Sequence, residues 1–451
     1  MDLFGTAGIR GDVRETVTPS LALAVGRAAG AVGEAFVLAR DGRETSPALA
    51  AAMEAGLESA GADVLRAGQL PTPALAYASR GRRGVMITAS HNPPHDNGIK
   101  LFVDGEEYGD DAEATIEERV AADEAPTEWT EWGSATRVSP LDDYRSAVAA
   151  YVRQHGATPD GLTVAVDCGN GMASLATPQV LRDLGADVQA LNANVDGHFP
   201  GRESKPTPES LADLRAFVAD GDTDFGIGHD GDADRIVIVD GDGDVVHEDT
   251  ILAVLAEHYV RDSDAGDPVV VTTPNASARI DERVRDAGGR VERVRLGALH
   301  EGIADAHDAG TSETEVVFAG EPWKHVHTDF GGWIDGVASA ALITRLLAAE
   351  SLGSRRDPVS ERPYRKVSVE CPNDRKAPTM STLETTLPET FPDASVDTQY
   401  GVRLELPDGS WTLVRPSGTE PYVRVYAESD AVDSLVEAVV DRVEQAVATA
   451  A

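Results

Sequence analysis

The sequence predicts an α/β protein of several domains, and three observations lead to this prediction. Its 451 residues are too many for one ordinary domain, and a hydrophobic share of 41% is enough to build several cores. Short apolar runs repeatedly precede a small or polar loop and then a helical pattern, which is the rhythm of α/β units. After about residue 361 the pattern becomes strand-rich and closes with a helix, which is typical of a smaller α+β domain.

The expected elements follow one another along the chain, and the loop after each early strand carries the unusual residues. Open α/β sheets bind ligands at the carboxyl ends of their strands, so we expect these loops to converge. The expected strands are residues 84–87, 162–166, 225–228, 269–271, 401–406 and 411–414, and the expected helices are 140–155, 250–259 and 431–447.

The charge balance is strongly acidic, with 77 acidic against 39 basic residues and a formal net charge of −38. Such a surface argues against binding to nucleic acid or to an anionic membrane. Lysine is scarce while arginine is plentiful, a bias that we interpret as adaptation to a high-salt cytoplasm, in a halophilic archaeon. An ordinary acidic mesophilic protein is the alternative. In so lysine-poor a chain, a lysine within a motif is a candidate functional residue.

The sequence shows no signs of a membrane or secreted protein. No run of about 18 apolar residues occurs, and the first residues lack the features of a signal peptide. The two cysteines exclude a disulfide framework and a cysteine-based metal site. We therefore expect a cytoplasmic protein, either a monomer or a homo-oligomer.

The first chemical motif, residues 87–94, places Ser90 directly after an apolar run. His91, Asn92 and two prolines follow, so the segment cannot continue as a helix and we expect the serine hydroxyl to be exposed. A Gly-x-Ser-x-Gly elbow is missing, and His91 is adjacent in sequence and therefore poorly placed as a base for Ser90. A serine that carries phosphate is the better interpretation, with an ordinary serine turn as the alternative.

The second motif places three carboxylates at alternate positions, Asp230, Asp232 and Asp234. In a looped backbone they can converge on one hard cation, and oxygen-only ligation favours Mg²⁺ over zinc. An EF-hand needs glycine at its sixth position and glutamate at its twelfth, where this chain has Arg235 and Gly241. A solvated acidic turn remains the alternative.

The third motif is a candidate phosphate clamp near the carboxyl end. Guanidinium groups, hydroxyls and exposed backbone amides hold phosphate by charge-assisted hydrogen bonds. A turn with a serine cap is the alternative. The candidate residues are Arg415, Ser417, Gly418, Thr419 and Arg424.

Two further segments are informative about function only in combination with these motifs. In residues 320–325, Glu321 and His325 can hydrogen-bond sugar hydroxyls and Trp323 can pack against a sugar ring. In residues 4–11 the glycines do not fit a dinucleotide fingerprint, which leaves Arg10 as a candidate phosphate contact.

Together these five segments resemble the α-D-phosphohexomutase family, the phosphoglucomutase and phosphomannomutase group, over essentially the whole chain. Residues 88–93 resemble its phosphoserine loop, 230–235 its metal loop, 320–325 its sugar loop and 415–421 its phosphate-binding loop. The resemblance implies four domains around a deep central cleft, three sharing an α/β core and a smaller α+β fourth that can rotate. The expected domains are residues 1–157, 158–250, 251–361 and 362–451.

The resemblance also implies a mechanism. Phosphorylated Ser90 gives its phosphoryl group to a sugar oxygen, the sugar bisphosphate turns round, and the other phosphate returns to Ser90. Mg²⁺ on Asp230, Asp232 and Asp234 takes a phosphoserine oxygen as a further ligand, and a sugar bisphosphate serves as activator. Lys100 is the expected general acid and base with Arg10 and Arg235 assisting, since a lysine near other cations can have its pKa lowered. His91 is the alternative base, or a group that steadies the phosphate.

Two departures from the family pattern concern the substrate. Trp323 and Lys324 stand where the sugar loop usually has serine and glycine, and residues 294–297 replace the usual Thr-x-Val-Gly, with Gly297 retained. Lys324 is a candidate contact for a phosphate or another anionic group. We expect a mutase that moves phosphate between the 1 and 6 positions of glucose or mannose phosphates. The alternatives are a phosphoglucosamine mutase, a phosphopentomutase and a non-catalytic paralogue that binds sugar phosphates.

Overall fold

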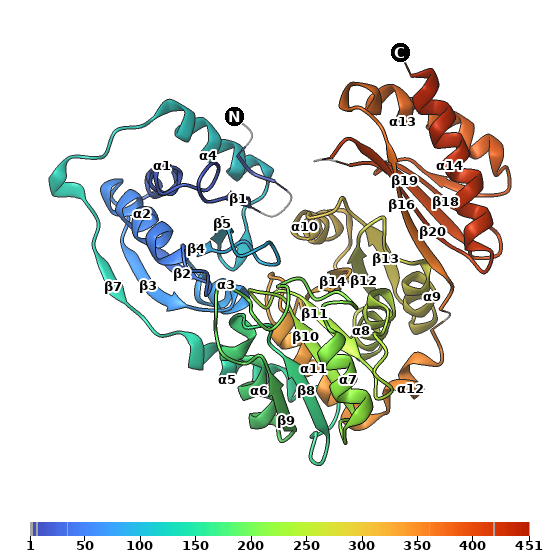
Figure 1. Ribbon diagram of the computed structural model, residues 1–451, viewed down its shortest axis with the longest axis horizontal. Helices are drawn as coiled ribbons and strands as arrows, with labels where there is room; N and C mark the ends of the chain where they lie inside the picture. Colours follow the sequence, from blue (N-terminus) through green and yellow to red (C-terminus); the bar gives the residue numbers. More distant parts are fainter. Residues whose placement is uncertain (1–2, 6–7, 34, 360, 418–419, 451) are drawn as a thin grey trace.

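The computed structural model describes residues 3–5, 8–33, 35–359, 361–417 and 420–450. Four β-sheets follow one another along the chain, each with its own helices, and we call them units I to IV (Figure 1). Units I to III are α/β and unit IV is α+β, as the sequence predicts. Within the described residues, no helix combines the length and the apolar character needed to cross a membrane.

Unit I contains the largest sheet, with strand order β1-β5-β4-β2-β3-β7 and β6 paired to β5. Its central strand β2 (Phe36–Arg40) is a run of apolar residues that is buried almost throughout, as a strand covered on both faces must be. The other strands are β1 (Ile9–Asp12), β3 (Val64–Gln69), β4 (Arg83–Ile87), β5 (Asp96–Val103), β6 (Glu106–Glu107) and β7 (Ala135–Arg137), and the helices are α1 (Pro19–Gly30), α2 (Ser46–Ser59), α3 (Thr72–Ala78) and α4 (Asp110–Ala122).

Units II and III have four-stranded sheets of order β11-β10-β8-β9 and β15-β14-β12-β13. Unit II comprises α5 (Leu141–Val152), β8 (Thr163–Asp167), α6 (Thr177–Leu184), β9 (Asp187–Leu191), α7 (Ala212–Asp220), β10 (Phe225–His229) and β11 (Ile236–Val239). Unit III comprises α8 (Glu248–Asp262), β12 (Asp267–Thr272), α9 (Ala278–Ala287), β13 (Arg290–Arg293), α10 (Leu299–Ala309), β14 (Thr314–Glu321), β15 (Lys324–Val326), α11 (Gly336–Ala349) and α12 (Leu352–Arg356).

The sheets of units I, II and III share one topology. In each, three successive strands run parallel and a fourth runs antiparallel to the third; this fourth strand is the edge of the sheet in units II and III, whereas in unit I β1 pairs with its other side. The four strands are β2 to β5 in unit I, β8 to β11 in unit II and β12 to β15 in unit III. The hairpin between the third and fourth strands therefore starts at the carboxyl end of a parallel strand, where α/β sheets place ligands.

Unit IV is an antiparallel sheet of order β16-β20-β19-β18-β17, with two long helices packed against it (Figure 1). Alternate residues of β20, together with Val414 of β19, point into a core shared with both helices, which leaves the other face free to carry polar groups. The elements are β16 (Tyr364–Glu370), α13 (Asn373–Thr390), β17 (Ser395–Asp397), β18 (Val402–Glu405), β19 (Trp411–Pro416), β20 (Tyr422–Glu428) and α14 (Val432–Thr449).

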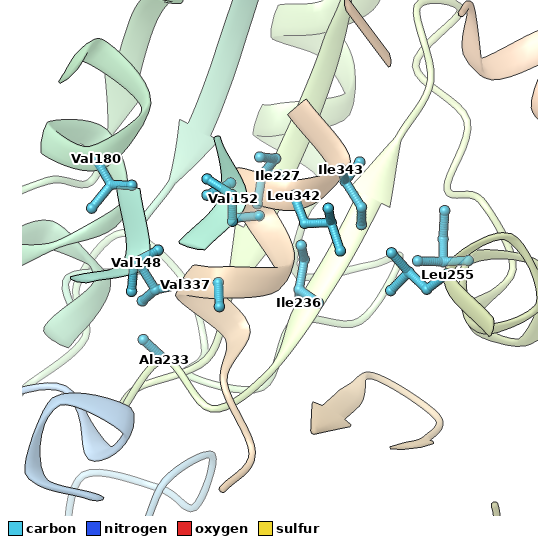
Figure 2. Packing of buried hydrophobic residues seen from close by; sticks show 14 of the residues in the cluster. Val148, Val152, Val180, Ile227, Ala233, Ile236, Leu255, Val337, Leu342 and Ile343 are labelled. Atoms are coloured by element: carbon cyan, nitrogen blue, oxygen red, sulfur yellow. The ribbon is translucent and has the colours of Figure 1, made fainter. Parts of the chain in front are cut away.

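Helix α11 joins the cores of units II and III. Nearly all of its residues are buried, as an apolar helix enclosed by other elements must be. Figure 2 shows Val337, Leu342 and Ile343 of this helix among side chains from α5, α6, β10 and β11. The same core extends to residues of unit I, so the three α/β units are held in fixed positions relative to one another.

A buried ion pair fastens unit IV to unit III. The Arg279 guanidinium lies 2.6 Å from the Glu428 carboxylate, and only 2% and 3% of the two side chains are exposed. The Trp411 indole donates a hydrogen bond of 2.7 Å to the same carboxylate, and Ser277 bonds to it as well. Removing one partner of such a pair costs about 3–5 kcal/mol, so these contacts define the position of unit IV in this conformation.

Candidate active site

The three equivalent hairpins of units I, II and III carry the serine, aspartate and sugar-loop motifs. At each turn a residue other than glycine adopts a left-handed backbone, namely Ser90 (φ 50°), Ala233 (φ 63°) and Trp323 (φ 71°). Strained backbone of this kind concentrates at functional sites. The hairpins meet beside a cavity of about 700 Å³ whose wall includes residues of all four units. Of the predicted site residues, Arg10, His91, Arg235, Glu321, Trp323, Lys324, Arg415 and Arg424 line it.

Ser90 lies where units I and II touch. Its hydroxyl donates a hydrogen bond of 2.7 Å to Asp230 Oδ2, so the first two motifs are in direct contact. The prediction of an exposed hydroxyl is wrong, because the aspartate loop covers Ser90 and leaves it fully buried. Nδ1 of His91 lies 3.3 Å from Ser90 Oγ, and because the hydroxyl proton of Ser90 goes to Asp230, His91 can only donate to this oxygen here and does not act as its base.

A buried arginine that the sequence analysis missed holds the Ser90 loop in shape. Arg43 donates hydrogen bonds to the backbone carbonyls of Ser90 at 2.9 Å and Asn92 at 2.7 Å. It also bonds to the carbonyls of Pro93 and Asp96, and pairs with Asp41 at 3.0 Å. The available signal was the position of Asp41 and Arg43 directly after the buried strand β2.

The three aspartates converge as expected for a cation site. One carboxylate oxygen of each lies within 4.8 Å of the others, and all three side chains are buried. Oδ1 of Asp232 and Oδ1 of Asp234 have no hydrogen-bond partner, although buried carboxylate oxygens normally do. Burial, reinforced by repulsion from Asp234 and Asp232, raises the pKa of Asp230 well above its usual range. These residues therefore fit a hard divalent cation bound by oxygen ligands.

Lys100 is placed beside the aspartates but as a paired cation. Its Nζ lies 3.0 Å from Glu107 and 3.2 Å from Asp234, and only 1% of its side chain is exposed. Burial lowers the pKa of Lys100, but attraction to Glu107, Asp234 and Asp232 outweighs burial and raises it overall. The expected lowering of this pKa is therefore wrong for this arrangement, because the attraction to three carboxylates outweighs the repulsion from Arg10.

Two arginines with unused donors stand at the cavity wall near Ser90. Nε and Nη2 of Arg10 are buried without a partner, and so is Nε of Arg235. Arg235 Nε lies 3.8 Å from both Asp230 and Asp234, so it is attracted by the aspartates without a hydrogen bond to them. Guanidinium groups in a cavity wall that keep unused donors indicate a place for an anion such as phosphate.

In the sugar loop the structure separates residues that are neighbours in sequence. Glu321 and Lys324 face the cavity, with Nζ of Lys324 3.5 Å from Glu321. His325 does not reach the cavity, which corrects its assignment to substrate binding. Side chains alternate along β15, so His325 points the other way, packs near Phe318 and contacts Ser339. Burial lowers the pKa of His325 to about 3.

Gly297, a predicted substrate-binding residue, does not line the main cavity. It lines an adjoining cavity of about 310 Å³ between units I and III, while its neighbour Leu296 lines the main cavity. Glu321 and Lys324 form part of both walls, so the two cavities are neighbours.

Unit IV contributes a second cationic group. Arg415 on β19 and Arg424 on β20 are directly opposite one another across the sheet, and each has an Nε without a partner. Like charges in this position repel, which favours a bound anion between them. Ser417 instead closes its own turn, because its hydroxyl accepts a hydrogen bond from the Glu420 amide. The predicted contacts of Gly418 and Thr419 lie outside the described residues.

Two lysines that were not predicted join this cationic group. Lys366 on β16 lines the cavity, with its Nζ 5.5 Å from the ring centroid of Tyr426. Burial and repulsion from Arg235, Lys366 and Arg424 lower the pKa of Lys205. A cavity wall this rich in cations, in a protein of net charge −38, focuses anionic ligands at one place. The scarcity of lysine in this chain was the available sequence signal for both residues.

Comparisons with known proteins agree with this arrangement. The α/β/α domains I, II and III of phosphoglucomutase/phosphomannomutase match residues 1–127, 142–243 and 247–362, and its C-terminal domain matches residues 367–446. A protein of Thermococcus kodakarensis named phosphopentomutase is 42% identical over 95% of this chain and 94% of its own length. A protein of Methanopyrus kandleri named probable phosphoglucosamine mutase is 41% identical over the same shares.

A solved structure extends the likeness to three dimensions. The crystal structure of a phosphoglucomutase/phosphomannomutase family protein from Burkholderia thailandensis has a TM-score of 0.87 and 25% sequence identity, and covers 100% of this chain and 98% of its own. The family models cover all four units in order, and the relatives above 40% identity span nearly the whole chain. The chain therefore belongs to the phosphoglucomutase/phosphomannomutase family, within the α-D-phosphohexomutases, and is an isomerase of the mutase type.

Proposed function

We propose that the protein is a phosphosugar mutase in which phosphorylated Ser90 exchanges its phosphoryl group with a sugar phosphate. The observation that carries the proposal is the contact of Ser90 with Asp230, beside a cavity that His91, Arg235 and the arginine pair of unit IV line. When one phosphate of the substrate is bound between Arg415 and Arg424, the rest of the sugar extends toward Ser90. A sugar bisphosphate then forms in the cavity and turns round before it returns a phosphate to Ser90.

Mg²⁺ fits the three aspartates together with an oxygen of phosphorylated Ser90. When bound, it supplies charge stabilisation to the phosphoryl group, because phosphoryl transfer depends mainly on positioning and electrostatics. Arg10 and Arg235 offer unused donors to the same phosphate oxygens. Lys100, held in place by Glu107 and Asp234, is the residue that we assign to the proton of the sugar hydroxyl.

For the sugar we propose a pentose phosphate, with transfer between its 1 and 5 positions. The relatives described above are named for pentose and glucosamine phosphates, which does not support the expectation of glucose or mannose. Trp323 and Lys324 occupy the positions of a serine and a glycine in the usual sugar loop and both line the cavity, so less room remains for a hexose. The Lys324 ammonium also repels the charged amine of a glucosamine.

Glucosamine phosphate is the second candidate substrate. Glu321 lines the cavity and can accept a hydrogen bond from a sugar amine, and Glu248 and Asp249 lie on the same wall. Against it, Lys324 lies 3.5 Å from Glu321 and compensates its charge. The two candidates therefore differ in whether Glu321 or Lys324 dominates recognition.

The test is a substrate panel followed by ³¹P NMR. Ribose 1-phosphate, glucosamine 1-phosphate, glucose 1-phosphate and mannose 1-phosphate are each incubated with the protein, Mg²⁺, molar KCl and a trace of the matching bisphosphate. We expect conversion of ribose 1-phosphate to the 5-phosphate with the highest kcat/KM, and no conversion by Ser90→Ala. Preferred conversion of glucosamine 1-phosphate would select the second candidate. No conversion of any sugar by folded protein would refute the catalytic proposal and leave a sugar-phosphate-binding paralogue.

A further inference from the structure

A cluster of two histidines and an aspartate lies away from the active site, between units II and III. His258 and Asp262 are one turn apart on α8, so their side chains share one face of that helix. His155 follows the end of α5 and reaches the same point from the other side. None of the three lines the catalytic cavity. We propose that these residues form a second metal site, for a borderline divalent ion of the Zn²⁺ type.

The distances match a tetrahedral ion. His155 Nδ1 lies 3.1 Å from His258 Nε2 and 3.2 Å from Asp262 Oδ2, and one possible ligand atom of each residue lies within 4.8 Å of the other two. Zinc bonds to nitrogen and oxygen of about 2.0–2.1 Å give tetrahedron edges of about 3.3 Å. Two of the three edges are therefore already close to this length, and the Asp262 side chain, which is 55% exposed, has room to adjust to the third.

Hydrogen bonding alone leaves this cluster incompletely satisfied. His155 Nδ1 carries either one lone pair or one proton, so it serves one of its two close neighbours fully and the other poorly. Asp262 forms an ion pair with no arginine or lysine in the part of the chain that the structure describes, and Arg261 beside it pairs with Glu257. Burial lowers the pKa of His258 to about 4 and also lowers the pKa of His155, so both rings are neutral, the form that binds metal.

The surroundings hold His155 in place before any ion arrives. Its carbonyl accepts a hydrogen bond of 2.7 Å from Arg345 of α11. The next residue, Gly156, has φ 59°, and a Cβ there would lie 2.3 Å from the Arg345 carbonyl oxygen. The His155 ring packs edge-on against Tyr151 and Tyr259, with centroids 5.2 Å and 5.6 Å away. Ligands fixed in this way lose little freedom on binding a metal.

The chemistry of the ligands separates this site from the aspartate site. Imidazole nitrogen suits Zn²⁺, Co²⁺ and Ni²⁺, whereas three carboxylates suit Mg²⁺. Arg345 and Arg355 repel a cation here, while Asp262 and Asp329 attract it. A bound ion has three protein ligands and takes water as its fourth from the exposed side. It links the end of α5 to α8, and so stabilises the junction of units II and III.

The test uses the full chain, freed of metal by a chelator and dialysed into excess Mg²⁺, which occupies the aspartate site. Co²⁺ is then titrated as a spectroscopic probe, and Zn²⁺ is added to displace it. We expect one Co²⁺ per chain with the intense visible absorption of tetrahedral coordination, and an increase in Tm with Zn²⁺. His258→Gln and the exposed Asp262→Asn are each expected to weaken binding by about 100-fold.

Two controls separate the proposal from other binding modes. His307→Gln removes an exposed helical imidazole elsewhere and is expected to leave the spectrum unchanged. Asp232→Asn impairs the aspartate site and is expected to retain the Co²⁺ absorption. The proposal is wrong if the unaltered protein shows no tetrahedral absorption, if both His258→Gln and Asp262→Asn keep it, or if Asp232→Asn loses it.

Discussion

Replacing the buried Arg43 tests whether this residue holds the Ser90 loop in its working shape. Arg43 has no exposed side-chain surface, pairs with Asp41, and donates to four backbone carbonyls of residues 90–96. Arg43→Met has a similar length but leaves the Asp41 carboxylate buried without its counter-charge. Breaking a buried ion pair costs about 3–5 kcal/mol of unfolding free energy. We expect a loss near the upper end of this range, because the four backbone carbonyls also lose their hydrogen-bond donor.

A catalytic effect is expected beside the loss of stability. A displacement of the Ser90 loop by about 1 Å lowers kcat by about 100-fold, because phosphoryl transfer depends on positioning. Arg40→Met is the matched control: Arg40 ends the same strand, but its guanidinium donates one hydrogen bond of 3.2 Å, to the Asp41 carbonyl. Its expected cost is about 1 kcal/mol, with kcat unchanged.

Calorimetric unfolding and single-turnover phosphate transfer from Ser90 measure the two effects. If Arg43→Met loses no more unfolding free energy than Arg40→Met and keeps full kcat, the Ser90 loop does not depend on Arg43 and the reasoning is wrong. A large loss of stability with normal kcat would show that Arg43 supports the fold without positioning Ser90.

Four further changes test other parts of the site and fold. Asp232→Asn is expected to raise the Mg²⁺ concentration for half-maximal activity by about 10- to 100-fold, and unchanged Mg²⁺ dependence would remove Asp232 from the metal site. Lys324→Ala is expected to shift the ratio of kcat/KM for glucosamine 1-phosphate over ribose 1-phosphate upward by about 10-fold, and an unchanged ratio would exclude Lys324 from sugar selection. Arg424→Ala is expected to raise KM more than it lowers kcat, whereas an unchanged KM would place the phosphate elsewhere. Burial and the neighbouring Asp110 and Glu107 raise the pKa of Glu113 to about 7. Between about pH 4.5 and 7 the folded state therefore binds a proton that the unfolded state does not, so the free energy of unfolding falls as pH rises through that range. Glu113→Gln is expected to flatten this dependence in denaturant titrations at several pH values, and an unchanged dependence would rule out Glu113 as its source.

The sequence predicted the fold class and the contact between the first two motifs because both depend on local patterns. Apolar runs before Thr88 and Asp230 marked the ends of parallel strands, and sheet geometry then brings such loops together. Figure 1 shows the same order of units along the chain that the changing pattern predicted, with the C-terminal helix α14 closing unit IV.

The errors arose where burial or side-chain direction depends on distant parts of the chain. The burial of Ser90 comes from the aspartate loop 140 residues away, which no local pattern encodes. The direction of His325 follows from the strand register, and a strand of three residues is too short to show its period in the sequence. The pKa of Lys100 was misjudged because Glu107 comes near it only through the pairing of β5 with β6.

The shared topology of units I, II and III has a consequence for how this enzyme can change over evolutionary time. Each copy of the repeated four-strand unit contributes one hairpin to the same cavity, and the three motifs lie on three different hairpins. If the hairpins have the separate roles that we propose, the Trp323 and Lys324 turn of the third copy can change without altering the serine and aspartate loops of the first two. On that proposal, a new sugar preference requires the exchange of only one short hairpin.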